Sequence, residues 1–199
     1  MANHLSAYID SEFDKSVKLL QAMSADAALR EAIARTVALS VEALKRGNKL
    51  FFAGNGGSAA DAQHWAGELV SRFNFDRPGL AAIALTTDTS ILTAIGNDYG
   101  YDYVFARQIE ALGRAGDVLF AISTSGNSKN IVRAITAARV AGITVVGFTG
   151  HSGGEMAQLC DVCFRMPSGE TPKIQEGHEF LGHLICGLIE HEMFANGPN

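Results

Sequence analysis

The sequence predicts an α/β protein, a three-layer αβα sandwich built on a five-stranded parallel sheet and preceded by two helices. Short apolar runs alternate with helical stretches along the chain, a pattern typical of parallel strands joined by crossover helices. The runs carry few polar residues, as expected of strands that are buried on both faces. Two helical stretches come before the first apolar run, so they are not crossovers and must pack elsewhere.

Each element follows from its local pattern. Apolar residues at three- and four-residue steps predict a first helix between Leu5 and Met23. A second helix is expected over residues 27–46, because Gly47 is a natural C-cap. The apolar runs predict strands over residues 49–53, 80–85, 118–122, 143–148 and 161–166. Further helices are expected over residues 58–73, 88–95, 128–141 and 172–194.

Length and composition indicate one domain and exclude several classes of partner. The chain has 199 residues, and 47% of them are hydrophobic. We divide it into an N-terminal helical pair (1–47), a parallel α/β core (48–170) and a C-terminal helix (171–199). The net charge is −5 and no basic block occurs, which argues against nucleic acid as a partner. No apolar run reaches membrane-spanning length and no secretory signal is visible, so no membrane association is expected.

The cysteines point to a reducing compartment. Three cysteines, an odd number, do not make a disulfide framework, so the cytoplasm is the expected location. Cys160 and Cys163 form a single C-x-x-C pair, with no second pair and no histidine nearby. We interpret both thiols as small residues of a buried strand, and a metal site there is the less favoured interpretation.

The loop after the third strand is the first candidate for chemistry. It opens a helix and reads Ser123-Thr124-Ser125-Gly126-Asn127-Ser128. Hydroxyls and backbone N–H groups at a helix N-terminus favour an anion, and a phosphate monoester fits such a loop without a lysine. No Gly-Lys-Ser/Thr follows, so the loop is not a nucleotide P-loop. The alternative is a polar turn in which Ser128 is an ordinary N-cap.

The loop after the first strand also leads into a helix, and it reads Gly54-Asn55-Gly56-Gly57-Ser58. Its glycines suit either a turn that needs positive φ or the close approach of a ligand. The third glycine of a dinucleotide loop is missing. The helix that follows places Asp61, His64 and Glu68 on one face. His64 and Glu68 can share a metal ion or a proton, and a solvated polar face is the alternative.

Two further segments carry polar groups. The last helix holds three histidines among apolar residues, and periodicity does not choose among His178, His183 and His191. Glu179 and His183 are the natural pair, one turn apart. The segment 97–100 ends the helix after the second strand, either as a simple C-cap and turn or on the ligand side of the sheet.

Together these motifs resemble the sugar isomerase (SIS) domain family, whose fold is flavodoxin-like. The resemblance covers nearly the whole chain. It rests on A-G-N-G-G-S-A-A-D-A-Q-H at 53–64, Glu68, G-N-D-Y-G at 96–100, S-T-S-G-N-S at 123–128 and Q-E-x-H-x-x-x-x-H at 175–183. It points to members that isomerise sedoheptulose 7-phosphate to D-glycero-D-manno-heptose 7-phosphate. That reaction is the first step of bacterial nucleotide-activated heptose synthesis, for lipopolysaccharide or capsule.

The resemblance also implies roles for particular residues. The substrate phosphate would be held by Ser123, Thr124, Ser125 and Ser128. The rest of the substrate would contact Asn55, Gly56, Gly57, Glu68, Asn97, Asp98 and Gln175. One zinc ion per subunit would be held by His64, Glu68, Gln175 and His183. Glu68 and His183 would be the acid–base pair, with Asp61 in a supporting role.

The implied chemistry leaves two alternatives open. An aldose–ketose conversion moves a proton between adjacent carbons through an enediol, so it needs a base and no nucleotide or redox cofactor. Glu68 is the candidate base, but a metal-bound carboxylate is a poorer base, so metal-assisted and metal-free mechanisms both stay open. Gln175 and His183 are eight residues apart, about 12 Å along a straight helix. Either Gln175 lies at a loosened helix start, or neighbouring subunits complete one site.

Self-association is the last expectation. The apolar stripe from Leu5 to Met23 precedes the first strand, and the last helix carries a second stripe between Leu181 and Leu188. One five-stranded sheet does not cover both, so we expect a homotetramer with sites near interfaces, as the resemblance also implies. Relatives that bind the bacterial replication initiator, or that sense sugar phosphates, are the alternatives. Neither needs His64, Glu68 and His183 together.

Overall fold

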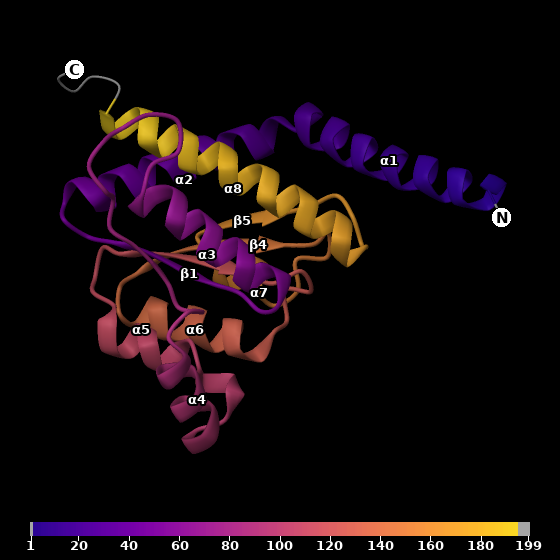
Figure 1. Cartoon of the computed structure of the whole chain (residues 1–199). Helices are drawn as coiled ribbons and strands as arrows, with labels where there is room; N and C mark the ends of the chain where they lie inside the picture. The colour runs from indigo at the N-terminus through magenta and orange to yellow at the C-terminus, as the bar shows by residue number, and fades with distance from the viewer. Residues whose placement is uncertain (1, 195–199) are drawn as a thin grey trace.

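The computed structural model describes residues 2–194 and confirms the predicted fold (Figure 1). One sheet of five parallel strands has the order β2-β1-β3-β4-β5. Its strands are β1 (Leu50–Ala53), β2 (Ala82–Ala84), β3 (Val118–Ile122), β4 (Thr144–Thr149) and β5 (Val162–Arg165). The end of the expected C-terminal unit, residues 195–199, lies outside the described residues.

The helices agree with the predicted order and add three short elements. They are α1 (Ala2–Ala25), α2 (Ala27–Lys45), α3 (Gly57–Val70), α4 (Thr89–Asp98), α5 (Ala106–Leu112), α6 (Lys129–Val140), α7 (Met156–Leu159) and α8 (Thr171–Phe194), with a 3-10 turn η1 (Tyr101–Tyr103). Neither η1, α5 nor α7 was predicted. Helix α3 ends at Val70, not near residue 73. The Arg77 guanidinium donates to the carbonyls of Glu68, Leu69 and Ser71, and the Glu190 carboxylate accepts from the N–H groups of Phe73 and Asn74, so these backbone groups are bonded outside the helix.

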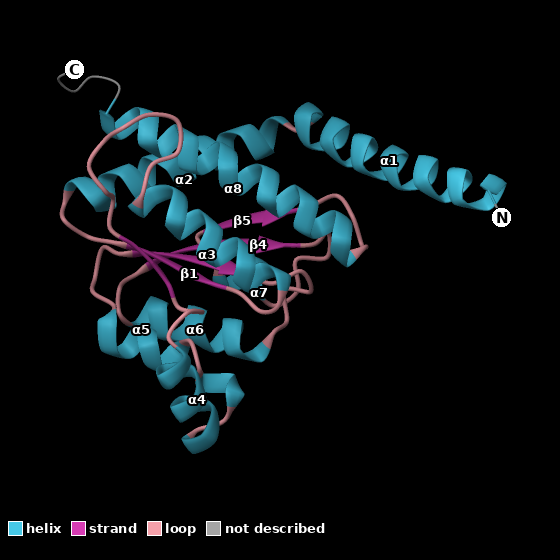
Figure 2. Cartoon of the chain, in the orientation of Figure 1, coloured by secondary structure: helices cyan, strands magenta, loops and turns pink. Residues whose placement is uncertain are grey.

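Helices cover both faces of the sheet (Figure 2), and the side chains of the strands alternate between a hydrophobic core on one face and a second core on the other. Phe52 and Phe120 point into the core formed with α2, α3 and α8, and this core also buries the inner end of α1. Phe51 and Leu119 point to the other face, where α5 and α6 pack. Both faces are therefore covered, which explains the continuous apolar character of the strands.

The sheet reverses its direction of growth between β1 and β3, which lie side by side although five elements, from α3 to α5, separate them in sequence. In open α/β sheets, ligands bind in the crevice outside the carboxyl ends of the strands at such a switch point. The loops after β1 and β3 meet there. A reciprocal pair of amide hydrogen bonds between Asn55 and Asn130, 2.9 and 2.8 Å long, ties the first loop to the start of α6.

The sheet ends in two short edge strands. β2 has three residues and β5 has four. Ile83 on β2 is 37% exposed, and Cys160 and Cys163, the predicted strand cysteines, are half-buried free thiols just before and within β5. No helix among the described residues is long and apolar enough to cross a membrane.

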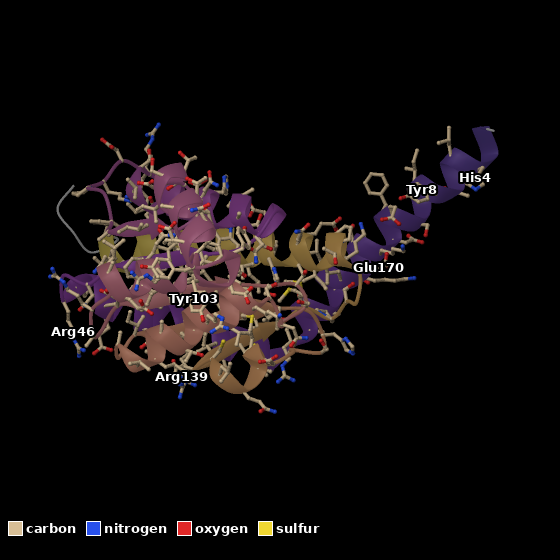
Figure 3. All side chains as sticks on the ribbon, turned by 90° about the horizontal axis from the view of Figure 1, so that it is seen from below. His4, Tyr8, Arg46, Tyr103, Arg139 and Glu170 are labelled. Atoms are coloured by element: carbon tan, nitrogen blue, oxygen red, sulfur yellow. The ribbon has the colours of Figure 1, made fainter. Side chains whose placement is uncertain are left out.

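Helix α1 extends well past the body of the molecule (Figures 1 and 3). Its inner end is buried through Leu19 and Met23, whereas Tyr8 and Phe13 on the outer part are 62% and 70% exposed. Figure 3 shows Tyr8 beyond Glu170, near which the helix meets α8. A Lys15–Glu170 ion pair of 2.8 Å joins α1 to the residue just before α8 at that point. The apolar stripe of α1 therefore extends past the part of the helix that the body of the molecule covers.

Candidate active site

The hydroxyls of residues 123–128, which we call the hydroxyl loop, converge at the N-terminus of α6. The Ser123 Oγ atom lies 2.9 Å from Ser128 Oγ and 3.4 Å from Ser125 Oγ. Ser128 occupies the N-cap position, but its hydroxyl makes no capping hydrogen bond. Thr124 and Ser125 line a cavity of about 330 Å³. Hydroxyls gathered beside a helix N-terminus suit an anion better than they suit an ordinary cap.

The hydroxyl loop is held rigid by the segment that follows β4. Gly126 has a φ of +69°, and a Cβ atom there would lie 2.1 Å from the carbonyl oxygen of Gly153, so only glycine fits. The Asn127 carboxamide oxygen accepts a 2.8 Å hydrogen bond from the Glu155 backbone N–H. The Gly150 N–H donates to the Thr124 carbonyl at 3.0 Å. The loop is thus preorganised before any ligand arrives.

The glycine loop after β1 lies against the start of α8. Gly56 caps α3 with a φ of +56°, as the sequence suggested for a tight turn. A Cβ atom at Gly57 would lie 2.5 Å from Gln175 Nε2, so the absence of a side chain makes room for that amide. Asn55 already bonds within the chain, since its Oδ1 atom also accepts from the Tyr101 hydroxyl at 3.3 Å.

Two imidazoles and a carboxylate meet between α3 and α8, and we call His64, Glu179 and His183 the imidazole cluster. The Nε2 atoms of His64 and His183 are 2.8 Å apart. Glu179 Oε1 lies 3.4 Å from His64 Nε2 and 3.3 Å from His183 Nε2. The two helices approach closely because buried Trp65 packs on Gly182, where a Cβ atom would lie 2.0 Å from the indole ring.

Further groups surround the imidazole cluster. Glu68 Oε1 is 3.3 Å from His64 Nε2. The Phe73 ring stacks on His183, with ring centroids 5.5 Å apart. Asp61 is half-buried and its Oδ2 atom has no hydrogen-bond partner. Burial, with the nearby charge of Glu179, raises the pKa of Asp61 to about 6.

The donor set of the cluster fits a zinc-type ion. Zinc binds imidazole nitrogens and carboxylate oxygens tetrahedrally at about 2.0–2.2 Å, so neighbouring ligand atoms are roughly 3.3–3.4 Å apart. The two carboxylate–imidazole separations have these values. The imidazole–imidazole separation of 2.8 Å is shorter because one Nε2–H donates to the lone pair of the other ring. A divalent ion needs the lone pair of each Nε2 atom. Binding of the ion would therefore release the proton that lies between the two rings.

The structure brings together some of the predicted site residues and separates others. The His64 Nε2 atom lies 2.8 Å from His183 Nε2 and 3.3 Å from Glu68 Oε1, so these two candidates lie on either side of the His64 imidazole. Gln175 lies in the second turn of α8, so a loosened helix start does not explain its spacing from His183. Asn97 and Asp98 hydrogen-bond to each other at 2.8 Å at the end of α4, and the described residues show no hydrogen bond from their side chains to the hydroxyl loop or the imidazole cluster.

Sequence reasoning did not assign Trp65, Phe73 or the carboxylate of Glu179 to the site. The spacing of Glu179 and His183 was a usable signal, since it places both on one helix face. No sequence signal indicated that Trp65 would bond to Glu179, because the two residues are 114 positions apart.

Comparison with known proteins identifies the family of the chain. The SIS domain matches residues 13–150. The fold and this match define an SIS-domain protein. Phosphoheptose isomerases from Burkholderia pseudomallei (strain 1710b) and Aneurinibacillus thermoaerophilus are 55% and 54% identical to the chain. The first alignment covers 98% of this chain and 99% of the relative, and the second covers 96% and 97%.

Solved structures give the same result. Phosphoheptose isomerase GmhA from Neisseria gonorrhoeae superposes with a TM-score of 0.87 at 44% identity, over 94% of this chain and 98% of that one. A phosphoheptose isomerase from Francisella tularensis gives 0.89 at 38% identity, over 93% and 97%. The chain belongs to the phosphoheptose isomerase family, and it is an isomerase.

Proposed function

We propose that this isomerase converts sedoheptulose 7-phosphate to D-glycero-D-manno-heptose 7-phosphate, the first step of heptose synthesis. One observation carries the proposal: the hydroxyl loop and the imidazole cluster flank the same switch point of the sheet. The hydroxyl loop follows β3, and His64 lies two turns into the helix that follows β1. A phosphate at the loop leaves the other end of a sugar chain to reach the carboxylates and imidazoles.

The acid–base roles follow from the side chains present. The hydroxyl loop binds the phosphate and fixes the orientation of the sugar. Glu68 removes a proton from one carbon next to the carbonyl group and returns it to the neighbouring carbon, since one carboxylate can serve both carbons on one face. His183 donates a proton to the carbonyl oxygen as the enediol forms, and it takes up the hydroxyl proton of the neighbouring carbon as the new carbonyl group forms. Stacking on Phe73 restricts the rotation of the His183 ring.

We propose zinc as the resident metal ion, one per subunit, because two imidazole nitrogens with carboxylate oxygen suit it. Held by His64, Glu68, Gln175 and His183, the ion would polarise the substrate's oxygen as a Lewis acid. Elemental analysis of protein purified without chelator should find about one divalent ion per chain. A fully active preparation that contains none would reassign these residues to acid–base work and sugar contacts.

We further propose a cytoplasmic homotetramer. The outer part of α1 exposes Leu5, Tyr8, Ile9, Phe13 and Val17, each at least half exposed, and a monomer leaves this stripe in water. Packing with the helices of other copies would bury it, with closed symmetry.

Ile9→Glu with Phe13→Glu should dissociate the assembly and lower activity in the same sample, measured by light scattering and an isomerase assay. Ser11→Glu, on the opposite face of α1, is the matched control and should do neither. A fully active monomer would exclude the assembly.

The direct test of the proposed function is an assay of the pure protein. Incubation with sedoheptulose 7-phosphate should yield the aldose heptose phosphate. Reduction that labels the carbonyl carbon, followed by mass spectrometry, distinguishes this aldose from the ketose. In deuterated water the product should gain one deuterium at the carbon that exchanges, because the enediol passes its proton through Glu68. Tight binding of the sugar phosphate without conversion would favour a sensing role instead.

A further inference from the structure

The side-chain amide of Asn55 is held from two sides, although the family resemblance assigns this residue only to the substrate. Its Nδ2 atom donates a 2.9 Å hydrogen bond to Asn130 Oδ1, and Asn130 Nδ2 donates a 2.8 Å hydrogen bond back to Asn55 Oδ1. The Tyr101 hydroxyl donates to the same Oδ1 atom at 3.3 Å. The amide thus joins the loop after β1 to the first turn of α6 and to the 3-10 turn η1.

Asn130 is a rigid anchor for this amide. It is 4% exposed and is the second residue of α6, so its carboxamide is fixed by the helix that carries it. Rotation of the Asn55 amide by 180° would bring Nδ2 against the Asn130 Nδ2 atom and Oδ1 against the Asn130 Oδ1 atom. Two repulsive contacts would then replace two hydrogen bonds. The pair therefore selects one orientation of the Asn55 amide.

The hydrogen-bonding capacity of Asn55 shows what this orientation leaves over. A carboxamide offers two N–H donors and two lone pairs on its oxygen. Asn130 and Tyr101 occupy both lone pairs, and Asn130 also occupies one N–H. Within residues 2–194, no side chain or carbonyl accepts from the second N–H. Asn55 is half-buried at the switch point of the sheet, so a ligand bound there can accept this last hydrogen bond.

We propose that Asn130 and Tyr101 are positioning residues, which fix the Asn55 carboxamide so that its second Nδ2–H donates to an oxygen of the sugar chain while the hydroxyl loop holds the phosphate. This inference rests on the proposed function, which supplies the sugar phosphate. The two loops then divide the recognition of the substrate. The hydroxyl loop binds the phosphate, and Asn55 binds the part of the substrate that inorganic phosphate lacks.

The test compares sedoheptulose 7-phosphate with inorganic phosphate, which has no sugar oxygen for Asn55 to reach. Asn130→Ala removes both bonds of the reciprocal pair, so it should lower kcat/KM by about tenfold or more. Tyr101→Phe removes one longer bond and should lower kcat/KM by about two- to fivefold. The inhibition constant of inorganic phosphate should change by less than about twofold in both variants. Tyr103→Phe is the matched control, because this second tyrosine of η1 has no hydroxyl hydrogen bond within the described residues.

A double-mutant cycle shows whether both residues act through Asn55. In the Asn55→Ala background, neither Asn130→Ala nor Tyr101→Phe should lower kcat/KM further, because the amide that they orient is gone. Circular dichroism shows whether each variant is folded. Effects that persist in full without the Asn55 amide would overturn the proposal, as would wild-type kcat/KM in folded Asn130→Ala. If Asn130→Ala does not fold, Tyr101→Phe tests the proposal through the same cycle.

A further outcome would identify a merely structural role. If the phosphate inhibition constant of Asn130→Ala rises as much as its kcat/KM falls, the substitution has disturbed the start of α6 and the positioning role is overturned.

The outcomes also separate the positioning role from the proposed function. Conversion of sedoheptulose 7-phosphate by wild-type protein, with no dependence on Asn130 or Tyr101, would overturn the positioning role and keep the function. Binding of this sugar phosphate without conversion would overturn the function. The dissociation constants of the same variants, measured by calorimetry, then test the positioning role. A protein that does not bind the sugar phosphate would overturn both.

Discussion

The hydroxyl loop and the imidazole cluster are built in different ways. All hydroxyls of the first come from six consecutive residues between β3 and α6. The second joins side chains from α3 and α8, and His64 and His183 are 119 positions apart. The loop depends on local backbone geometry, whereas the cluster depends on how tightly two helices pack. Substitutions should therefore separate binding of the phosphate from the chemistry.

The largest effect is expected at the chemical half of the site. Glu68→Gln removes the proposed base and His183→Gln removes the proposed proton donor, so each should lower kcat by about 10²-fold or more. Their KM values for the sugar phosphate should change much less, because the hydroxyl loop is intact. Steady-state kinetics measure both quantities. His191→Gln changes an exposed histidine on the same helix and is the control. Near-normal turnover by Glu68→Gln or His183→Gln would show that the substituted residue does not have the role proposed for it.

The reverse separation is expected at the hydroxyl loop. Ser123→Ala with Ser128→Ala removes both partners of a 2.9 Å contact, so the fold should tolerate the pair. Loss of one charge-assisted bond to phosphate costs about 1.5–3 kcal/mol, which raises KM by roughly 10- to 100-fold. The inhibition constant of inorganic phosphate should rise by a similar factor. If KM and phosphate inhibition both stay at wild-type values, the phosphate binds elsewhere. Ser11→Ala is the control.

Helix packing can be tested without touching a polar side chain. Gly182→Ala would place a Cβ atom 2.0 Å from the Trp65 ring, so α3 and α8 must move apart. We expect a loss of about 1–3 kcal/mol in the free energy of unfolding, with lower kcat and an unchanged phosphate inhibition constant. Gly67→Ala is the matched control on α3, because nothing lies within 4 Å of its added Cβ, and it should stabilise slightly. Denaturant titration that finds Gly182→Ala as stable as wild type would contradict the packing argument.

The smallest effect is expected in the pH dependence of stability, through a buried histidine that joins α8 to the end of β4. His178 on α8 is fully buried and its Nε2 atom lies 3.2 Å from the carbonyl oxygen of Thr149, next to the hydroxyl loop. Burial lowers the pKa of His178 to about 4, below the ordinary 6.5. Between these values the unfolded chain binds more protons than the folded chain. The free energy of unfolding should therefore fall as pH decreases from 6.5 to 4, by no more than about 1.4 kcal/mol per pH unit.

His178→Gln removes this titration and keeps a donor for the Thr149 carbonyl. Comparing its stability with wild type from pH 7 to 4.5 cancels the contribution of other groups. The gap between the two curves should narrow as the pH falls. Parallel curves would mean that His178 does not titrate differently on folding.

The same contrast explains which parts were predictable from the sequence. Parallel strands, the order of the main helices and the hydroxyl loop follow from short segments with a clear period or motif. Tyr101–Tyr103 and Met156–Leu159 are too short to show a period, so both helical turns were missed. Phe73 continues the apolar spacing of α3, yet the helix stops earlier because buried Glu190 binds the backbone N–H groups of Phe73 and Asn74.

Within the site, local spacing identified candidates but did not rank them. Three histidines on α8 satisfy the same period, and only packing shows that His178 faces the sheet while His183 faces α3. Trp65 follows His64 directly in sequence, but its role depends on contact with a residue of another helix. Such choices are made by tertiary contacts that a single sequence does not display.

The short edge strands have a consequence for how the protein avoids misassembly. An exposed strand edge offers unpaired N–H and C=O groups that can capture a strand from another chain and seed aggregation. β2 offers only three residues at one edge, and β5 ends in Arg165 at the other. Neither edge is long enough to template an added strand of ordinary length. Any contact between copies is thereby left to side chains on helices, which can specify a partner and a stoichiometry. Backbone pairing would not limit growth in this way.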